Sequence, residues 1–126
     1  MNVPEEILLR TKDLEWVDKS LEGLSHKMLW RDEETGASIA LVRFQQGAGI
    51  PSRHEHASNQ FMYCLRGRYT YVPTGLTLTE GSFYWNPKGS AHGPTHADEE
   101  SVLLEIYDGP HYPVQPSWYT NPDDAR

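Results

Sequence analysis

The chain has 126 residues, of which 37% are hydrophobic and 23% charged, a composition typical of one folded domain rather than a disordered segment. The formal net charge of −7 argues against binding to nucleic acid, which needs clustered lysine and arginine, and against an anionic membrane surface. No apolar run approaches the ~20 residues of a membrane span, and the N-terminus lacks the basic and apolar pattern of a secretory signal. We therefore expect a cytoplasmic protein that binds neither nucleic acid nor a membrane.

Residues 1–25 form a predicted N-terminal arm ahead of the first strand. The spacing of apolar residues gives Glu5–Arg10 some helical character. The same mixture of acidic and aromatic residues is also compatible with an extended strand that packs on a neighbour. The arm is therefore expected to be either helical over Glu5–Arg10 or extended against a neighbour.

Residues 26–109 consist of short apolar stretches separated by turn residues, without a long helical pattern. Gly67 is expected to end the strand that precedes it. Cys64, the only cysteine, excludes an intrachain disulfide and is expected to be a small buried hydrophobic residue. The pattern predicts an antiparallel sandwich or barrel. The expected strands are residues 26–32, 37–46, 53–56, 60–66, 68–72, 76–79, 80–86 and 100–109.

Residues 110–126 form a tail rich in proline and aromatic side chains. The prolines keep the tail out of a central strand, because proline cannot donate a backbone hydrogen bond to a neighbouring strand. The aromatic side chains indicate that the tail packs either on its own barrel or on a partner subunit. The residues concerned are Pro110, Pro113, Pro116 and Pro122, together with Tyr112, Trp118 and Tyr119.

The stretch SRHEHASNQF, residues 52–61, carries two histidines one residue apart. Side chains alternate along a strand, so His54 and His56 point to the same side, as two ligands of one metal ion require. Gln60 follows a short bend and can turn back toward the pair, and His92 lies in a tight turn farther along the chain. Spacing alone supports a solvated pair and a metal half-site equally.

Two longer stretches resemble the pair of motifs that identifies the cupin superfamily. HEHASNQFMYCLRG resembles the first motif, with Gln60 in the position of the motif's glutamate and matches at His54, His56 and Gly67. GSFYWNPKGSAH resembles the second motif, with matches at Gly81, Pro87, Gly89 and His92. The resemblance implies an all-β fold, an antiparallel double-stranded β-helix known as the cupin jelly-roll barrel, formed by residues 26–109.

The resemblance also implies a metal site formed by His54, His56, Gln60 and His92. Fe(II) is the first expectation for the ion, with Zn, Ni or Mn as alternatives. Gln60 is then either a weak fourth ligand or a hydrogen-bond donor behind the ligands. A neutral amide leaves the ion more net positive charge than a carboxylate would, and it cannot act as a carboxylate base.

Two further residues are candidates for supporting this site, and no catalytic residue is assigned. His96 is expected in a loop beside the pocket, as a supporting or proton-carrying group or as a solvated histidine. Glu105 lies in the apolar stretch VLLEIY, where a buried carboxylate needs a partner. It either accepts a hydrogen bond from a ligand imidazole or faces outward in a salt bridge. The candidate pocket walls are Phe61 or Met62, Tyr69 or Tyr71, Phe83 or Trp85, and Tyr107.

Within the cupins, WNPKGSAHGPTH is most similar to the ChrR-type group, which includes the cupin half of a zinc-binding anti-sigma factor and dioxygenases that cleave acetylacetone or dihydroxyacetophenone. The resemblance implies a dioxygenase that cleaves a C–C bond in a small dicarbonyl or hydroxy-ketone bound to the metal. A redox-neutral isomerase, cyclase or lyase and a non-catalytic cupin that senses a ligand are the alternatives. Single cupins often pair through N-terminal strands, so a homodimer is expected.

Overall fold

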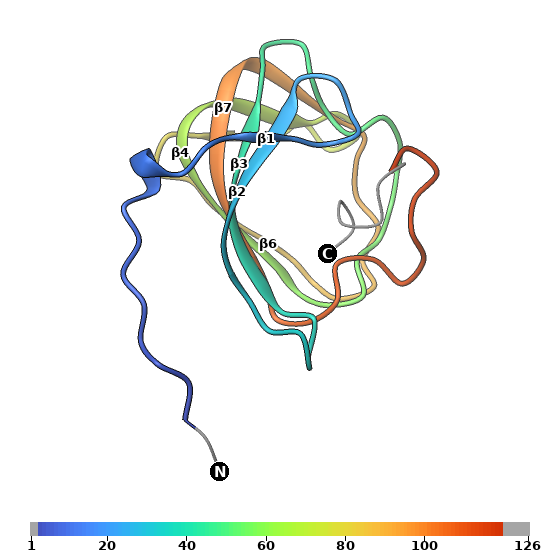
Figure 1. Ribbon diagram of the computed structural model, residues 1–126. Coiled ribbons are helices and arrows are strands. Elements are labelled where there is room, and N and C mark those ends of the chain that lie inside the picture. The colour runs from blue at the N-terminus through green and yellow to red at the C-terminus, as the bar shows by residue number, and fades with distance from the viewer. Residues whose placement is uncertain (1–2, 120–126) are drawn as a thin grey trace.

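The computed structural model describes residues 3–119, and nearly all their regular structure is antiparallel β-sheet. One seven-stranded sheet curls into a barrel (Figure 1), with the order β1-β2-β3-β7-β4-β5 and with β6 paired to β4. The all-β antiparallel barrel predicted from the sequence is confirmed. Within residues 3–119, no helix has the length and apolarity needed to span a membrane. The elements are the 3-10 turn η1 Thr11–Asp13 and the strands β1 Val17–Asp18, β2 Leu24–Arg31, β3 Ser38–Phe44, β4 Gln60–Tyr71, β5 Leu76–Thr79, β6 Phe83–Asn86 and β7 Thr95–Tyr107.

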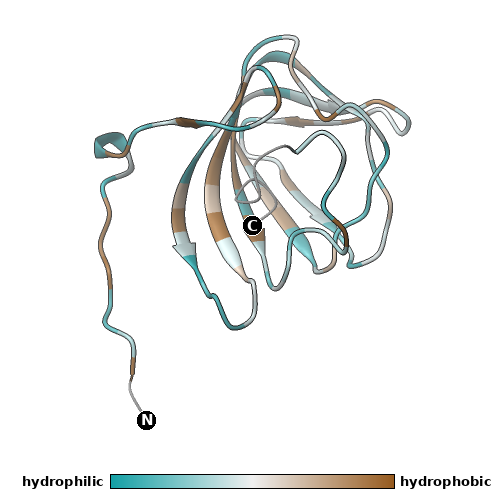
Figure 2. Cartoon of the chain, turned by 45° about the vertical axis from the view of Figure 1, so that its right-hand side comes forward, coloured by the Kyte–Doolittle hydropathy of each residue, from teal (hydrophilic) through white to brown (hydrophobic). Residues whose placement is uncertain are grey.

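The hydrophobic core lies inside the barrel, on the inner faces of its strands. Side chains alternate along β4, so Met62 and Cys64 are buried whereas Tyr63 and Leu65 are exposed. Figure 2 shows hydrophobic and hydrophilic bands alternating along the curved strands. Cys64 is fully buried, which confirms the role expected for it. The core cluster comprises Leu24, Val42, Phe44, Ile50, Met62, Cys64, Tyr69, Tyr71, Leu78, Ala97 and Leu103.

The strand register decides which of the candidate pocket walls face the barrel interior. Phe83 and Trp85 are exposed, and Tyr84 between them takes the inward position opposite Met62 on β4. The buried members of the candidate set are Met62, Tyr69, Tyr71 and Tyr107. The interior is therefore lined by tyrosines from both β4 and β7.

Strand β4 is longer than predicted, because it does not end at Gly67 but continues to Tyr71. Its pairing with β7 shifts register between Cys64 and Arg66 and again between Arg66 and Arg68. Gly67 has a φ of +106°, so it accommodates an irregularity within the strand rather than a turn after it.

Strand β7 is also longer than predicted, since it begins at Thr95 rather than at residue 100. The expectation that His96 lies in a loop is therefore wrong, because the backbone of β7 pairs with β4 at that position. The predicted strand at residues 53–56 is reduced to one isolated bridge between His54 and His92. These two histidines are thus placed by loops that pair with each other.

Residues 3–10 form an exposed arm that projects away from the barrel (Figure 1). Of the two conformations expected for the arm, the helical one over Glu5–Arg10 is wrong, because these residues have no regular structure and no packed face that could stabilise so short a helix. The sheet begins farther along, where β1 pairs with β2 of the same chain. Residues 1–2 lie outside the described residues.

Residues 110–119 leave the sheet after β7 and lie against their own barrel. Tyr112 and Tyr119 reach the interior and line its cavity, and Trp118 packs against the core cluster. Pro122 and the rest of residues 120–126 lie outside the described residues. The C-terminal segment, defined here as residues 110–119, therefore contributes side chains to the barrel interior.

Candidate metal centre

Three histidines from two distant parts of the sequence meet beside the barrel interior. The backbones of His54 and His92 pair with each other, since each N–H donates to the other's carbonyl oxygen, at 2.9 and 2.8 Å. The side-chain nitrogens that His54, His56 and His92 offer all lie within 4.8 Å of one another. Imidazole nitrogens bind zinc at about 2.0–2.1 Å, so nitrogens a few ångströms apart can share one ion. The structure thus brings together the three predicted histidine ligands.

Hydrogen bonds orient the first two imidazoles. The Nδ1 atom of His54 lies 2.9 Å from the carbonyl oxygen of Ser52, and the Nδ1 atom of His56 lies 2.9 Å from that of His111. A carbonyl oxygen only accepts, so both rings carry their proton at Nδ1. Their Nε2 lone pairs are then free for an ion, which is the usual arrangement behind a metal-bound histidine.

The third imidazole is held by a hydroxyl group. The Nδ1 atom of His92 lies 2.7 Å from the Tyr84 hydroxyl, and its Nε2 lies 3.0 Å from the Nε2 of His56. Because His56 presents a lone pair there, metal-free His92 donates from Nε2 and accepts from Tyr84 at Nδ1. Metal ligation at Nε2 needs the opposite tautomer, with Nδ1 donating to Tyr84. A hydroxyl can both donate and accept, so Tyr84 suits both states.

Burial keeps all three imidazoles neutral, as metal ligation requires. Desolvation lowers the pKa of His54 and lowers that of His56 to about 3, with a smaller contribution from neighbouring His54. Desolvation, followed by repulsion from His54 and His56, lowers the pKa of His92 to about 2. The donor set therefore fits a divalent transition metal ion.

We expect the stability of the metal-free protein to fall as the pH is lowered from about 6.5 toward 3. The unfolded chain protonates His56 and His92 near the ordinary pKa of 6.5, whereas the folded chain does so only at about 3 and about 2. The unfolded state therefore binds more protons in this window, and each histidine adds up to about 1.4 kcal/mol per pH unit. Urea unfolding with a chelator at several pH values measures this slope. His92→Ala should lower this slope by the amount that corresponds to about one proton taken up on unfolding. An unchanged slope would contradict the lowered pKa of His92.

Gln60 faces the same cavity as the three histidines. Its Nε2 donates to the Tyr107 hydroxyl at 2.8 Å and to a carboxylate oxygen of Glu105 at 3.1 Å. Its Oε1 is buried and accepts no hydrogen bond from any of the described residues. An unpaired buried carbonyl oxygen beside three neutral imidazoles fits a fourth ligand to a metal ion.

Glu105 takes neither of the two positions expected from the sequence. It lines the cavity rather than facing outward, and it accepts a hydrogen bond from Gln60 rather than from a ligand imidazole. Burial raises the pKa of Glu105, while the charge of Lys19 and hydrogen bonds from Gln60 and Tyr107 oppose that rise. Glu105 thus contacts the candidate ligand Gln60 but is not itself one of the candidate ligands.

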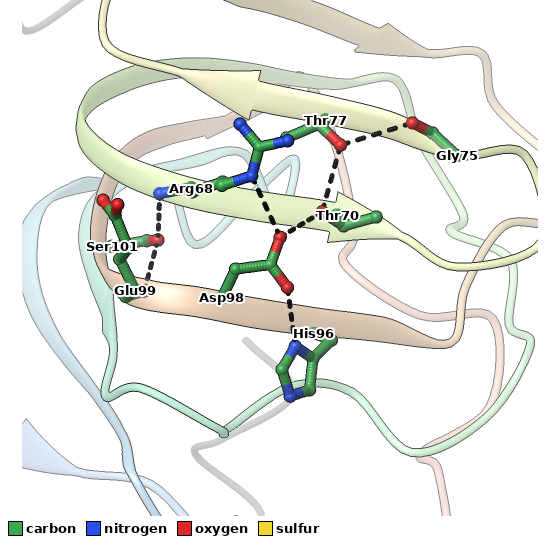
Figure 3. A network of polar contacts seen from close by, with 8 residues as sticks. All are labelled: Arg68, Thr70, Gly75, Thr77, His96, Asp98, Glu99 and Ser101. Carbon is green, nitrogen blue, oxygen red and sulfur yellow. Dashed lines mark hydrogen bonds and ion pairs between the residues drawn. The ribbon is translucent and has the colours of Figure 1, made fainter.

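His96 does not reach the candidate metal centre. It is exposed, and its Nδ1 lies 2.9 Å from a carboxylate oxygen of Asp98. Figure 3 shows that Asp98 also contacts Arg68 and Thr70 of β4, so this carboxylate links two strands. His96 belongs to this exposed polar network, and none of its hydrogen bonds among the described residues reaches the three histidines.

His111 is a buried residue of the centre that the sequence did not reveal. Its carbonyl oxygen pairs with His56, and its Nε2 lies 2.7 Å from the Tyr107 hydroxyl. Its ring stacks on His56, with ring centroids 5.0 Å apart and an angle of 18° between the ring planes. Burial holds the pKa of His111 well below its usual range. No sequence motif identifies His111, because it lies just after the last strand in a proline-rich tail.

The interior beside the histidines has little room. The cavity lined by His54, His56 and His92 has a volume of about 20 Å³, enough for a water molecule or an ion but not for a substrate. A pocket of about 330 Å³ shares Tyr71 and His92 with this cavity, and among residues 3–119 Arg53 is the only charged side chain that lines it. Its walls also include Tyr71, Pro73, Leu76, Tyr84, Trp85 and Asn86.

Comparison with known families gives one match that covers most of the chain. The profile of the family described as the ChrR Cupin-like domain matches residues 4–111. No curated protein matches the chain. The matched segment includes all the strands and both loops that carry the three histidines.

Solved structures with the same fold include proteins of different activities. An acetylacetone dioxygenase from Acinetobacter johnsonii has a TM-score of 0.71 and 19% identity, over 87% of this chain and 77% of that one. A protein of unknown function with a cupin-like fold from Ralstonia eutropha JMP134 has a TM-score of 0.71 and 22% identity, over 84% and 74%. The polyketide cyclase RemF from Streptomyces resistomycificus has a TM-score of 0.68 and 15% identity, over 96% and 91%. At these identities the likeness establishes the fold alone.

Proposed function

Because this chain belongs to the ChrR cupin-like domain family, we propose that it is a metal-dependent enzyme whose ion is bound by His54, His56 and His92. Gln60 is the proposed fourth ligand, through its unpaired Oε1. The clustering of three neutral imidazoles is the observation that carries the proposal. We propose Fe(II) as the ion, with Zn, Ni or Mn as alternatives.

The proposed reaction is the oxidative cleavage of a C–C bond in a small dicarbonyl or hydroxy-ketone. Fold likeness to an acetylacetone dioxygenase supports this choice. When bound, Fe(II) would supply both Lewis-acid charge and redox chemistry with dioxygen. Since the four proposed ligands are all neutral, no carboxylate binds the ion directly, which favours a substrate that binds as an anionic enolate.

The pocket beside His92 is the proposed route for the substrate. Its volume of about 330 Å³ suits a small molecule, and the inner cavity is too small to hold one. Arg53 gives the pocket a positive charge although the chain carries a net charge of −7. The residues of the chain would thus attract an anionic substrate and place it beside a ligand histidine.

Metal analysis combined with oxygen uptake tests the proposed reaction. We expect near-stoichiometric iron in protein purified without an affinity tag, and oxygen consumption when a 1,3-diketone such as acetylacetone is added. Iron-loaded protein that consumes no oxygen with any member of a diketone and hydroxy-ketone panel would contradict the dioxygenase proposal.

A redox-neutral cyclase, isomerase or lyase is the second candidate. The neutral amide of Gln60 favours it, since an ion with no directly bound carboxylate is a strong Lewis acid and needs no redox chemistry. Fold likeness to the cyclase RemF gives it further support. Turnover by zinc- or nickel-loaded protein under anaerobic conditions would establish this function instead. Ligand binding without turnover in either test would point to the third possibility, a sensor.

We further propose that the protein is a cytoplasmic homodimer that binds a small molecule. The arm at residues 3–10 supports dimerisation, because Ile7 and Leu8 are exposed although both are large and apolar. Light scattering coupled to size exclusion should give twice the chain mass of 14.4 kDa. Deletion of residues 1–10 should shift the mass toward one chain, and a monomeric intact protein would contradict the proposal.

A further inference from the structure

We infer that Glu105 is a positioning residue for the metal centre: it holds the Gln60 amide with Oε1 toward the histidines and supplies the negative charge that Gln60 lacks. The inference rests on the proposed metal site and deepens it. It assigns a specific task to a carboxylate that belongs to neither sequence motif.

The strand register brings the two residues together on the inner face of the barrel. Gln60 pairs with Tyr107, and Met62 pairs with Glu105, so Gln60 and Glu105 are diagonal neighbours on β4 and β7. On the other side of Glu105, β3 contributes Ala40, whose small side chain leaves room for a carboxylate. The contact is thus built into the central strands rather than into a loop.

The chemistry of the hydrogen bonds allows one orientation of the amide. The two N–H bonds of Gln60 are directed to the Glu105 carboxylate at 3.1 Å and to the Tyr107 hydroxyl at 2.8 Å. A half-turn of the amide would set Oε1 against the carboxylate, which only accepts, and would turn the NH₂ group toward the cation site. Glu105 therefore selects the orientation that presents a ligand oxygen.

The position of the charge explains why glutamine can occupy the glutamate position of the motif. The carboxylate of Glu105 polarises the amide through the shared N–H, which makes Oε1 a better donor of electron pairs. A glutamate at position 60 would place a second carboxylate against Glu105, and like charges at that distance repel each other. Residues 60 and 105 therefore act as a pair that holds one negative charge.

Cobalt binding to four proteins tests the inference without any assay of turnover. The proteins are the wild type, Glu105→Gln, the charge-swapped double variant Gln60→Glu/Glu105→Gln, and Glu55→Gln as a control. Glu55 lies between the two ligand histidines in sequence but is exposed, so the control makes the same charge change outside the cavity. Competition with a chelator gives the Co(II) affinity, and the visible Co(II) spectrum reports the ligand set.

We expect Glu105→Gln to weaken Co(II) binding about 10- to 100-fold, as is usual for a residue that orients a ligand. The control should remain within about threefold of the wild type, since an exposed charge is screened by solvent. The charge swap should restore most of the affinity and alter the spectrum, because a carboxylate then replaces the amide oxygen.

Two results would overturn the inference. One is a Glu105→Gln variant that binds Co(II) as tightly as the wild type. The other is a loss of affinity in Glu105→Gln that the charge swap does not restore, which would indicate that Glu105 serves only to maintain the fold. Wild-type protein that binds no Co(II) would instead contradict the metal centre, so the two failures can be told apart.

Discussion

Substitution of His92 by alanine is expected to lower the affinity for the metal ion by more than about 100-fold. The expected loss is larger than the ~10- to 100-fold loss typical of residues that only support ligands, because His92 itself would supply a ligand atom. The three histidine side chains offer nitrogens within 4.8 Å of one another, and removal of one leaves two protein nitrogens and the Gln60 oxygen. Elemental analysis after desalting measures the retained metal.

His96→Ala is the matched control for this experiment. His96 is exposed and pairs with Asp98, so its removal changes the histidine count without touching the cavity. It should retain the metal content of the wild type. Equal metal content in the His92→Ala and wild-type proteins would rule out the three-histidine centre.

Substitution of Gly67 by alanine is expected to destabilise the fold by on the order of 3 kcal/mol. The positive φ of Gly67 costs a residue with a side chain about 1–2 kcal/mol, and a steric clash adds about 1–3 kcal/mol. A Cβ atom there would lie 2.5 Å from the carbonyl oxygen of Glu100 and from the Cα atom of Ser101, both backbone atoms of β7. The two longest strands would have to separate at this point.

Gly47→Ala separates the two contributions. Gly47 also has a positive φ, +87°, but a Cβ atom there would meet nothing within 4 Å. We expect this variant to lose only the conformational part, about 1–2 kcal/mol. Urea unfolding of both variants gives the comparison, and equal losses would mean that the contact between Gly67 and β7 does not limit stability.

Most of the barrel could be predicted because its determinants are local. Alternating side chains and turn residues mark the strands, and two motifs mark the loops that carry His54, His56 and His92. The irregularity at Gly67 could not be predicted, since a glycine inside an apolar run is equally compatible with a strand end and with a bulge. Which of the two it is depends on Glu100 and Ser101 of β7, which face Gly67 and lie more than thirty positions away in sequence.

The surroundings of the histidines were harder to predict than the histidines themselves. Glu105 in an apolar strand needs a partner, but only the register of β4 and β7 identifies that partner as Gln60. His111 contacts His56 across 55 positions of sequence, through a segment that joins no strand. The position of His96 was predicted wrongly because it lies only four residues after His92 in sequence. A strand begins between them at Thr95, and His96 is exposed on that strand.

The carbonyl contact between His111 and His56 can form only after residue 111 has been synthesised, 55 positions after residue 56. Chains emerge from the ribosome N-terminus first, so His54 and His56 are available well before His92, and His92 before His111. Until then, His56 would lack the carbonyl acceptor that orients its ring in the folded protein. The last orienting contact of the proposed metal centre would then form only when the C-terminal segment folds back onto the barrel.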